Sequence, residues 1–156
     1  GGSFNQGRRD IETGIQEERL IIIDTGPIVA FFDKDDQYHQ LCVEILKGIK
    51  EPLITTWPVI TEAFYLLNFS WRVQDDLWQF IQRGGIHIEQ VEGSSYPRIR
   101  ELMKKYHDLP MDLADATLVA LGEEKKLSIV FTLDHKDFRI YRPKHKGRFT
   151  LIPSKL

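Results

Sequence analysis

The chain contains the stretch LIIIDTGP at residues 20–27, in which a run of aliphatic residues ends at an acid. Four consecutive large aliphatic residues predict a strand that is buried on both faces, as in the centre of a parallel sheet. The following Thr25-Gly26-Pro27 predicts a turn. We therefore expect Asp24 at the carboxyl end of a central strand.

The rest of the sequence alternates between helical and strand-like patterns. Apolar spacing and breakers predict helices over residues 28–32, from Asp35 or Asp36 to 49, and over 57–69, 74–82, 97–106 and 110–127, with strands over 53–55, 86–91, 128–133 and 149–152. Such alternation favours parallel strands joined by right-handed crossovers. The predicted fold is a three-layer α/β/α sandwich with four or five mainly parallel strands. It forms one domain over residues 20–156, preceded by an N-terminal extension over residues 1–19.

Composition excludes several classes of protein. The 156 residues include one cysteine, Cys42, so no internal disulfide can form, which fits a reducing compartment. No apolar run approaches the roughly 20 residues of a membrane span, and no secretory signal is visible. We therefore expect a cytoplasmic protein. A net charge of −2 disfavours nonspecific nucleic-acid binding through charge alone, although residues 136–148 are strongly basic.

Four acids stand alone in strongly apolar sequence: Asp24, Glu62, Asp115 and Asp134, with Asp112 close to the third. Asp24 and Asp134 end predicted strands, and the carboxyl ends of parallel strands line the ligand crevice of an open sheet. Glu62 and Asp115 lie on apolar helix faces. Burying an unpaired carboxylate costs several kcal/mol, and these stretches carry no matching basic residues. A divalent cation is the simplest partner, and oxygen-only ligands favour Mg²⁺ or Mn²⁺.

Each acid also has a structural explanation. Asp112 suits a helix N-cap, which would put Asp115 in the first turn, where acids suit the helix dipole. Glu62 could pair with Arg72, and Asp24 or Asp134 could begin a turn or loop. The hypothesis that all of these acids are structural at once is weaker than the hypothesis that any single one of them is structural. The histidines show no metal-ligand spacing, and there is no phosphate-binding glycine loop or nucleophile elbow.

Four stretches together resemble one known family. They are IIIDTGPIVAFFD (residues 21–33), TEAFYLL (61–67), DLADATLVA (112–120) and TLDHKDFRIYR (132–142). In order and spacing they are similar to the PIN-domain family of metal-dependent ribonucleases, in particular the VapC-like toxins of prokaryotic toxin–antitoxin pairs. The resemblance covers nearly the whole chain from about residue 20.

The resemblance implies a function and a set of site residues. The catalytic and metal-binding acids would be Asp24, Glu62, Asp115 and Asp134, with Asp112 as a capping or additional metal-binding acid. Thr25 and Thr132 match the hydroxyl residues that lie beside these acids in the family, and they are candidates for contact with the substrate. The implied activity is Mg²⁺- or Mn²⁺-dependent hydrolysis of RNA. The implied partners are a protein antitoxin and a second copy of the chain, through helices such as residues 74–82.

Other residues are candidates for contacts with RNA. In the basic stretch we expect Arg139 and Arg142 to contact phosphates, with a solvated loop as the alternative. Trp57, Trp71 and Tyr141 are candidates for base stacking, although core packing is the stronger explanation for Trp57.

Two other functions remain open from the sequence alone. One is a non-catalytic PIN-like module that binds RNA or protein. The other is a phosphotransfer domain of the dehalogenase or receiver kind. The sequence disfavours a dehalogenase-like phosphatase, because Gly26 stands where a second aspartate is expected two residues after Asp24.

Overall fold

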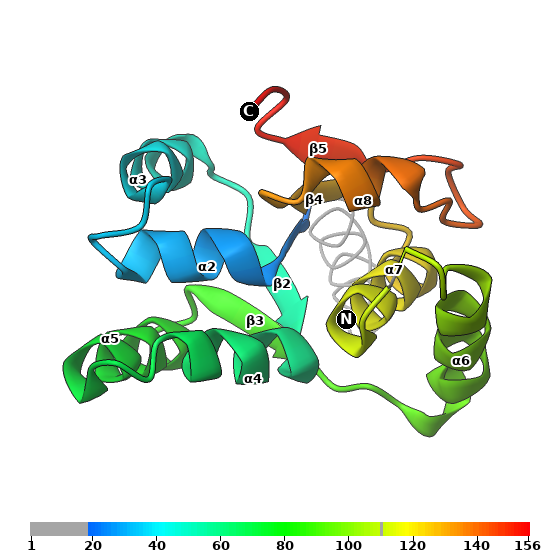
Figure 1. Cartoon of the computed structure of the whole chain (residues 1–156), viewed down its shortest axis with the longest axis horizontal. Coiled ribbons are helices and arrows are strands. Elements are labelled where there is room, and N and C mark those ends of the chain that lie inside the picture. The colour runs from blue at the N-terminus through cyan, green and yellow to red at the C-terminus, as the bar shows by residue number, and fades with distance from the viewer. Residues whose placement is uncertain (1–18, 110) are drawn as a thin grey trace, which may run out of the picture.

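The structure of the protein, a computed structural model, describes residues 19–109 and 111–156. These residues alternate strands and helices around a single sheet (Figure 1). Apart from Arg19, the predicted N-terminal extension lies outside the described residues. No helix in the described part is long and apolar enough to cross a membrane.

The sheet has five strands, all parallel, in the order β3-β2-β1-β4-β5. In chain order these are β1 (Ile21–Ile23), β2 (Leu53–Thr56), β3 (Ile86–Glu89), β4 (Ile129–Phe131) and β5 (Thr150–Ile152). The strand β1 lies at the centre, with Ile22 beside Ile54 of β2 and Val130 of β4. All three β1 residues are buried, as the uninterrupted aliphatic run predicts.

Helices cover both faces of the sheet. The connections from β1 through β2 to β3 run in one direction and contain α2 (Thr25–Phe32), α3 (His39–Gly48), α4 (Trp57–Leu66) and α5 (Trp71–Gln82). The chain then returns past β1 through a short 3₁₀ turn η1 (Gly93–Ser95), α6 (Tyr96–Lys105) and α7 (Leu113–Lys125), and α8 (His135–Ile140) follows β4. Right-handed crossovers that run in opposite directions put their helices on opposite faces. Figure 1 shows α2 to α5 on the left of the view and α6 and α7 on the right. The five-stranded parallel sheet with helices in its connections confirms the predicted α/β fold.

The strand order creates a switch point beside β1. The chain leaves β1 towards β2 on one side and later returns to β4 on the other. At such a point the loops that follow the two neighbouring strands diverge, so a crevice forms at the carboxyl ends of the strands. The residues that follow β1 and β4 therefore lie on opposite sides of one opening.

The prediction of a turn at Thr25-Gly26-Pro27 is wrong, because these residues form the first turn of α2. Asp24 caps this helix by accepting a hydrogen bond from the Thr25 N–H at 2.8 Å. The first amides of a helix have no acceptor within the helix, so a proline there loses no hydrogen bond. The residues Thr25-Gly26-Pro27 therefore have the composition of a turn, but the cap at Asp24 makes them the start of a helix.

Several other element predictions differ from the structure. The helix predicted to begin at Asp35 or Asp36 begins at His39 as α3, so neither acid caps it, and the strand predicted over residues 86–91 ends at Glu89. The fourth helix, α4, ends at Leu66 rather than at residue 69, and α5 begins at Trp71 rather than at residue 74 because Ser70 caps it. The Ser70 hydroxyl accepts a hydrogen bond from the Val73 N–H at 3.4 Å. The six-residue helix α8 was not predicted, since only His135 and Phe138 are buried and a helix this short shows too little apolar spacing.

Candidate active site

A cleft of about 540 Å³ opens at the carboxyl ends of β1 and β4. Seven carboxylates line it: Asp24, Asp36, Glu62, Asp112, Asp115, Asp134 and Asp137. Among the described residues, its lining includes no lysine, arginine or histidine. The structure therefore brings all five sequence-predicted acids to one cleft, together with two acids that were not predicted as ligands.

Asp24 is held at the floor of the cleft by two neutral donors. It is 7% exposed, and its Oδ1 accepts the capping hydrogen bond from Thr25. Its Oδ2 accepts a hydrogen bond from the Thr132 hydroxyl at 2.8 Å, which joins the segments that follow β1 and β4. Burial raises the pKa of Asp24 to about 6 even though both hydrogen bonds favour the ionised form.

Asp115 projects from the first turn of α7. Asp112 is the N-cap of this helix and accepts a hydrogen bond from the Asp115 N–H at 2.7 Å, as the sequence predicts. The Asp115 side chain is 9% exposed, and its Oδ2 accepts a hydrogen bond from the Tyr141 hydroxyl at 2.8 Å. Burial and the nearby Asp24 carboxylate raise the pKa of Asp115 to about 8.

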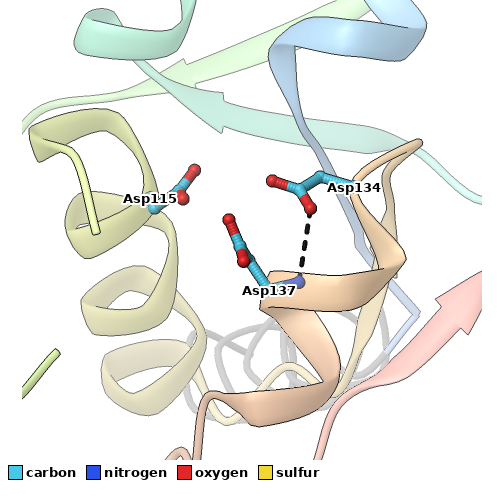
Figure 2. Close-up of side chains that lie close together, drawn as sticks. All are labelled: Asp115, Asp134 and Asp137. Atoms are coloured by element: carbon cyan, nitrogen blue, oxygen red, sulfur yellow. Dashed lines mark hydrogen bonds between the residues drawn. The ribbon is translucent and has the colours of Figure 1, made fainter. Parts of the chain in front are cut away.

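Asp134 and Asp137 face Asp115 from the start of α8 (Figure 2). Asp134 caps α8 by accepting a hydrogen bond from the Asp137 N–H at 3.3 Å, and its own N–H donates to the Thr132 hydroxyl at 2.9 Å. One carboxylate oxygen from each of Asp115, Asp134 and Asp137 lies within 4.8 Å of the others. Burial, with Asp134 nearby, raises the pKa of Asp137. These three carboxylates point into a common space that suits one cation.

Glu62 and Asp36 complete the walls of the cleft. Glu62 is half-buried on α4, where burial and the Asp112 carboxylate raise its pKa. Asp36 accepts a hydrogen bond from the Tyr38 N–H at 2.8 Å and so shapes the turn before α3. Sequence reasoning gave Asp36 only a capping role. The sequence leaves open whether Asp137 is a ligand, and its spacing from Asp134, an N-cap followed three residues later by an acid, is the available signal.

The donor set fits a hard divalent cation. The side chains at the cleft offer carboxylate and hydroxyl oxygens, which Mg²⁺ and Mn²⁺ prefer. The Thr25 hydroxyl lines the cleft, is buried, and has no hydrogen-bond partner in the described part of the chain. A buried hydroxyl without a partner is uncommon in proteins, and a bound ion or its water would satisfy it.

The predicted substrate contacts lie in different surroundings. Thr132 is fully buried and its hydroxyl is engaged by Asp24 and Asp134. Arg139 and Arg142 are exposed and lie outside the lining of the cleft, where the Arg142 guanidinium donates to the last carbonyls of α8. Their contacts with RNA stay predictions.

The three aromatic candidates for base stacking separate into two groups. Tyr141 is fully buried, so the prediction that it stacks on a base is wrong. The sequence does not indicate that Tyr141 is buried, because Tyr141 lies in a basic stretch. Trp57 and Trp71 are 38% and 67% exposed, so the expected core packing of Trp57 is wrong and both rings remain available for contacts.

A parallel sheet with an acidic cleft at the switch point agrees with the result of comparison with known families. The model of the PIN domain matches residues 21–143, and the chain belongs to the PIN domain family. The chain is 29% identical over 143 residues to Ribonuclease VapC26 of Mycobacterium tuberculosis, an alignment that covers 85% of this chain and 100% of that protein.

Two solved structures share the fold. The crystal structure of VapC20 from Mycobacterium tuberculosis, described as a sarcin-ricin loop cleaving toxin, superposes with a TM-score of 0.68 and 19% identity over 75% of this chain and 93% of that one. VapBC2 from Rickettsia felis, solved bound to a DNA fragment from its promoter, gives a TM-score of 0.57 and 16% identity over 83% of this chain and 96% of that one. At these identities the likeness concerns the fold.

Proposed function

We propose that this chain is a metal-dependent endoribonuclease that hydrolyses RNA phosphodiester bonds and acts as the toxin of a toxin–antitoxin pair. The observation that carries the proposal is the convergence of Asp24, Asp115 and Asp134 from three segments into one cleft whose described lining has no basic side chain. The proposal is supported by membership of the PIN domain family and by the likeness to Ribonuclease VapC26, which the alignment covers over its whole length.

Asp24, Asp115 and Asp134 would hold Mg²⁺ or Mn²⁺, with Asp137 beside them and Glu62 on the facing wall. The ion, when bound, acidifies a coordinated water and neutralises charge on the phosphoryl oxygens. A ring of acids alone repels a phosphate, so the substrate can approach only a cleft whose charge is compensated.

The chain's own residues orient the acids and set their charge. The Thr25 N–H and the Thr132 hydroxyl keep Asp24 in one orientation, which lowers the reorganisation needed on binding. Without a nearby cation, burial and the Asp24 carboxylate favour the protonated form of Asp115, because they raise its pKa to about 8. We assign Arg139 and Arg142 to phosphates that flank the cleavage site, because both guanidinium-bearing residues lie on or just after the helix that carries Asp134.

Cleavage of single-stranded RNA tests the proposal directly. We expect the parent chain to cleave RNA at internal positions when Mg²⁺ or Mn²⁺ is present. We expect EDTA to abolish this cleavage. Asp24→Asn and Asp115→Asn each remove one ionisable ligand and are expected to lower the rate at least a hundredfold. Asp108→Asn is the matched control, because Asp108 is an exposed acid (87% exposed side chain) outside the cleft lining.

The outcomes separate the proposed enzyme from a binding module. Cleavage that is unaffected by EDTA and by both cleft variants would contradict a metal-dependent active site. A stable RNA complex with no turnover in either metal would favour a non-catalytic module instead.

We also assign a protein antitoxin, a homodimer and a cytoplasmic location to this chain. The likeness to VapBC2 supports the antitoxin, and the exposed aromatic rings of Phe69 and Trp71 before and at the start of α5 suit contact with a second copy. Induced expression is expected to stop bacterial growth for the parent chain and not for Asp115→Asn.

Light scattering of the parent chain is expected to give twice the monomer mass, and Trp71→Glu is expected to lower the measured mass towards that of the monomer. A monomeric parent chain would contradict the dimer.

A further inference from the structure

Tyr141 directly follows α8 and lies entirely inside the protein. Its ring packs edge-on against Tyr106 and Phe138, with centroid distances of 5.1 and 5.2 Å. Because neighbours on two sides hold the ring, packing rather than solvent determines where the hydroxyl lies. That hydroxyl donates a 2.8 Å hydrogen bond to Oδ2 of Asp115, which is on another helix.

The hydrogen bond ties together the two helices that carry the clustered acids. Asp134 and Asp137 stand at the start of α8, Tyr141 stands at its end, and Asp115 belongs to α7. One end of α8 therefore supplies two carboxylates, and the other end holds the third carboxylate in place. Oδ2 of Asp115 accepts the hydrogen bond from the phenol, and Oδ1 accepts none from the residues that the structure describes.

We propose that Tyr141 is a positioning residue of the cation site, which fixes Asp115 so that a single carboxylate oxygen faces Asp134 and Asp137. The inference rests on the proposed metal-dependent function and adds a residue that holds a ligand without touching the ion. Hydrogen bonds to ligating carboxylates orient metal ligands, and their loss costs about 10- to 100-fold in affinity.

Tyr106 provides a matched control for the phenol. It belongs to the same aromatic cluster, is 7% exposed, and its hydroxyl accepts a hydrogen bond from the Arg142 N–H at 2.9 Å. Tyr106→Phe and Tyr141→Phe thus each remove one buried hydroxyl from the same part of the core. Only the second removes a hydrogen bond to an acid of the cleft.

The test measures Mn²⁺ affinity of the full chain by electron paramagnetic resonance, titrating free Mn²⁺. We expect Tyr141→Phe to weaken binding about tenfold and Tyr106→Phe to change it less than about twofold. In the Asp115→Asn background Tyr141→Phe is expected to have no further effect, because its partner is already altered. Unchanged affinity in Tyr141→Phe, equal losses in both tyrosine variants, or an undiminished loss in the Asp115→Asn background would overturn the assignment.

Two further results keep the inference separate from the proposed function. If the parent chain binds no Mn²⁺, the metal-dependent function fails and the role of Tyr141 fails with it; if the parent binds and Tyr141→Phe binds equally, only the role of Tyr141 fails. Should Tyr141→Phe not fold, tyrosine labelled with ¹³C at Cζ reports on the parent chain. Addition of Mg²⁺ is then expected to shift the Tyr141 signal and leave that of Tyr106, and an unshifted Tyr141 signal would overturn the assignment.

Discussion

Replacing Asp24 by asparagine is expected to stabilise the metal-free protein at neutral pH. Burial raises the pKa of Asp24 from 3.8 to about 6 in the folded chain. The folded state therefore binds the proton more tightly than the unfolded state, so stability falls as the pH rises from 3.8 towards 6. Above about pH 6 the full penalty of the ionised carboxylate applies. Asparagine keeps the shape of the side chain and removes this penalty.

The expected gain follows from the pKa and from one lost hydrogen bond. A rise of about two pKa units at about 1.4 kcal/mol each corresponds to about 3 kcal/mol. The carboxamide oxygen of asparagine still accepts from the Thr25 N–H, but its amide group cannot accept the hydrogen bond that the Thr132 hydroxyl donates. That loss costs about 1 kcal/mol. The net increase in the free energy of unfolding is about 2 kcal/mol.

Urea unfolding in EDTA at pH 7.5 and at pH 4.5 measures this difference. With a typical slope of about 1–3 kcal/mol per molar urea, the midpoint of Asp24→Asn is expected to lie about 1 M above that of the parent at pH 7.5. At pH 4.5 the parent carboxyl is already protonated in the folded state, so the gain falls close to zero.

One other titrating group adds to the difference: the Asp24 carboxylate raises the pKa of Asp115, so Asp24→Asn also lowers the penalty for ionising Asp115 at pH 7.5. Burial lowers the pKa of His135, which destabilises the folded state at acidic pH, but the effect is common to the parent and the variant. Asp108→Asn is the control for removal of an exposed charge. Lower stability of Asp24→Asn at pH 7.5, or the same difference at both pH values, would refute the reasoning.

Three further predictions concern the same region. Mg²⁺ or Mn²⁺ is expected to raise the melting temperature of the parent chain at pH 7.5, and EDTA to reverse the rise, because the ion binds only the folded site; no rise at millimolar ion would contradict a preformed site. Asp112→Ala is expected to lower the free energy of unfolding by about 1 kcal/mol, because the N-cap of α7 is lost. Asp112→Asn retains a capping side chain and is the control. Equal losses of stability in the two variants on chemical unfolding would contradict the capping role. Gly122→Ala is expected to cost about 1–3 kcal/mol in the same assay, since its Cβ would lie 2.9 Å from a ring carbon of Phe149 and 3.3 Å from Cδ1 of Ile22; an unchanged midpoint would show that both side chains yield freely.

The fold was predictable because its central strands are buried on both faces. An uninterrupted aliphatic run such as Ile21–Ile23 has few alternatives to a central strand. Element boundaries were less predictable, because caps decide them. The residues Thr25-Gly26-Pro27 have the composition of a turn and become helical only because Asp24 caps them. Ser70 likewise extends α5 beyond the start that apolar spacing predicts.

The acids of the cleft were predictable only where their sequence surroundings are apolar. Asp24 and Asp115 stand out because a lone charge in a buried segment needs a partner. Asp36 and Asp137 lie beside other charged residues, so no apolar surrounding marks them, and only its spacing from Asp134 marks Asp137. Their place in the cleft depends on how the turn before α3 and the short helix α8 pack, which local patterns do not report.

The acids are oriented by neutral donors, and this has a consequence for the cation. The Thr132 hydroxyl, the Tyr141 hydroxyl and the Thr25 N–H hold the buried carboxylates without cancelling their charge. A lysine or arginine in the same places would lower the pKa values and would compete with a metal ion for the same oxygens. With neutral donors no basic side chain compensates the carboxylates, and the raised pKa values of Asp24 and Asp115 mean that a bound cation would have to displace protons to take up this role. The architecture therefore leaves charge compensation to an ion, and it links the stability of the fold to the occupancy of the site.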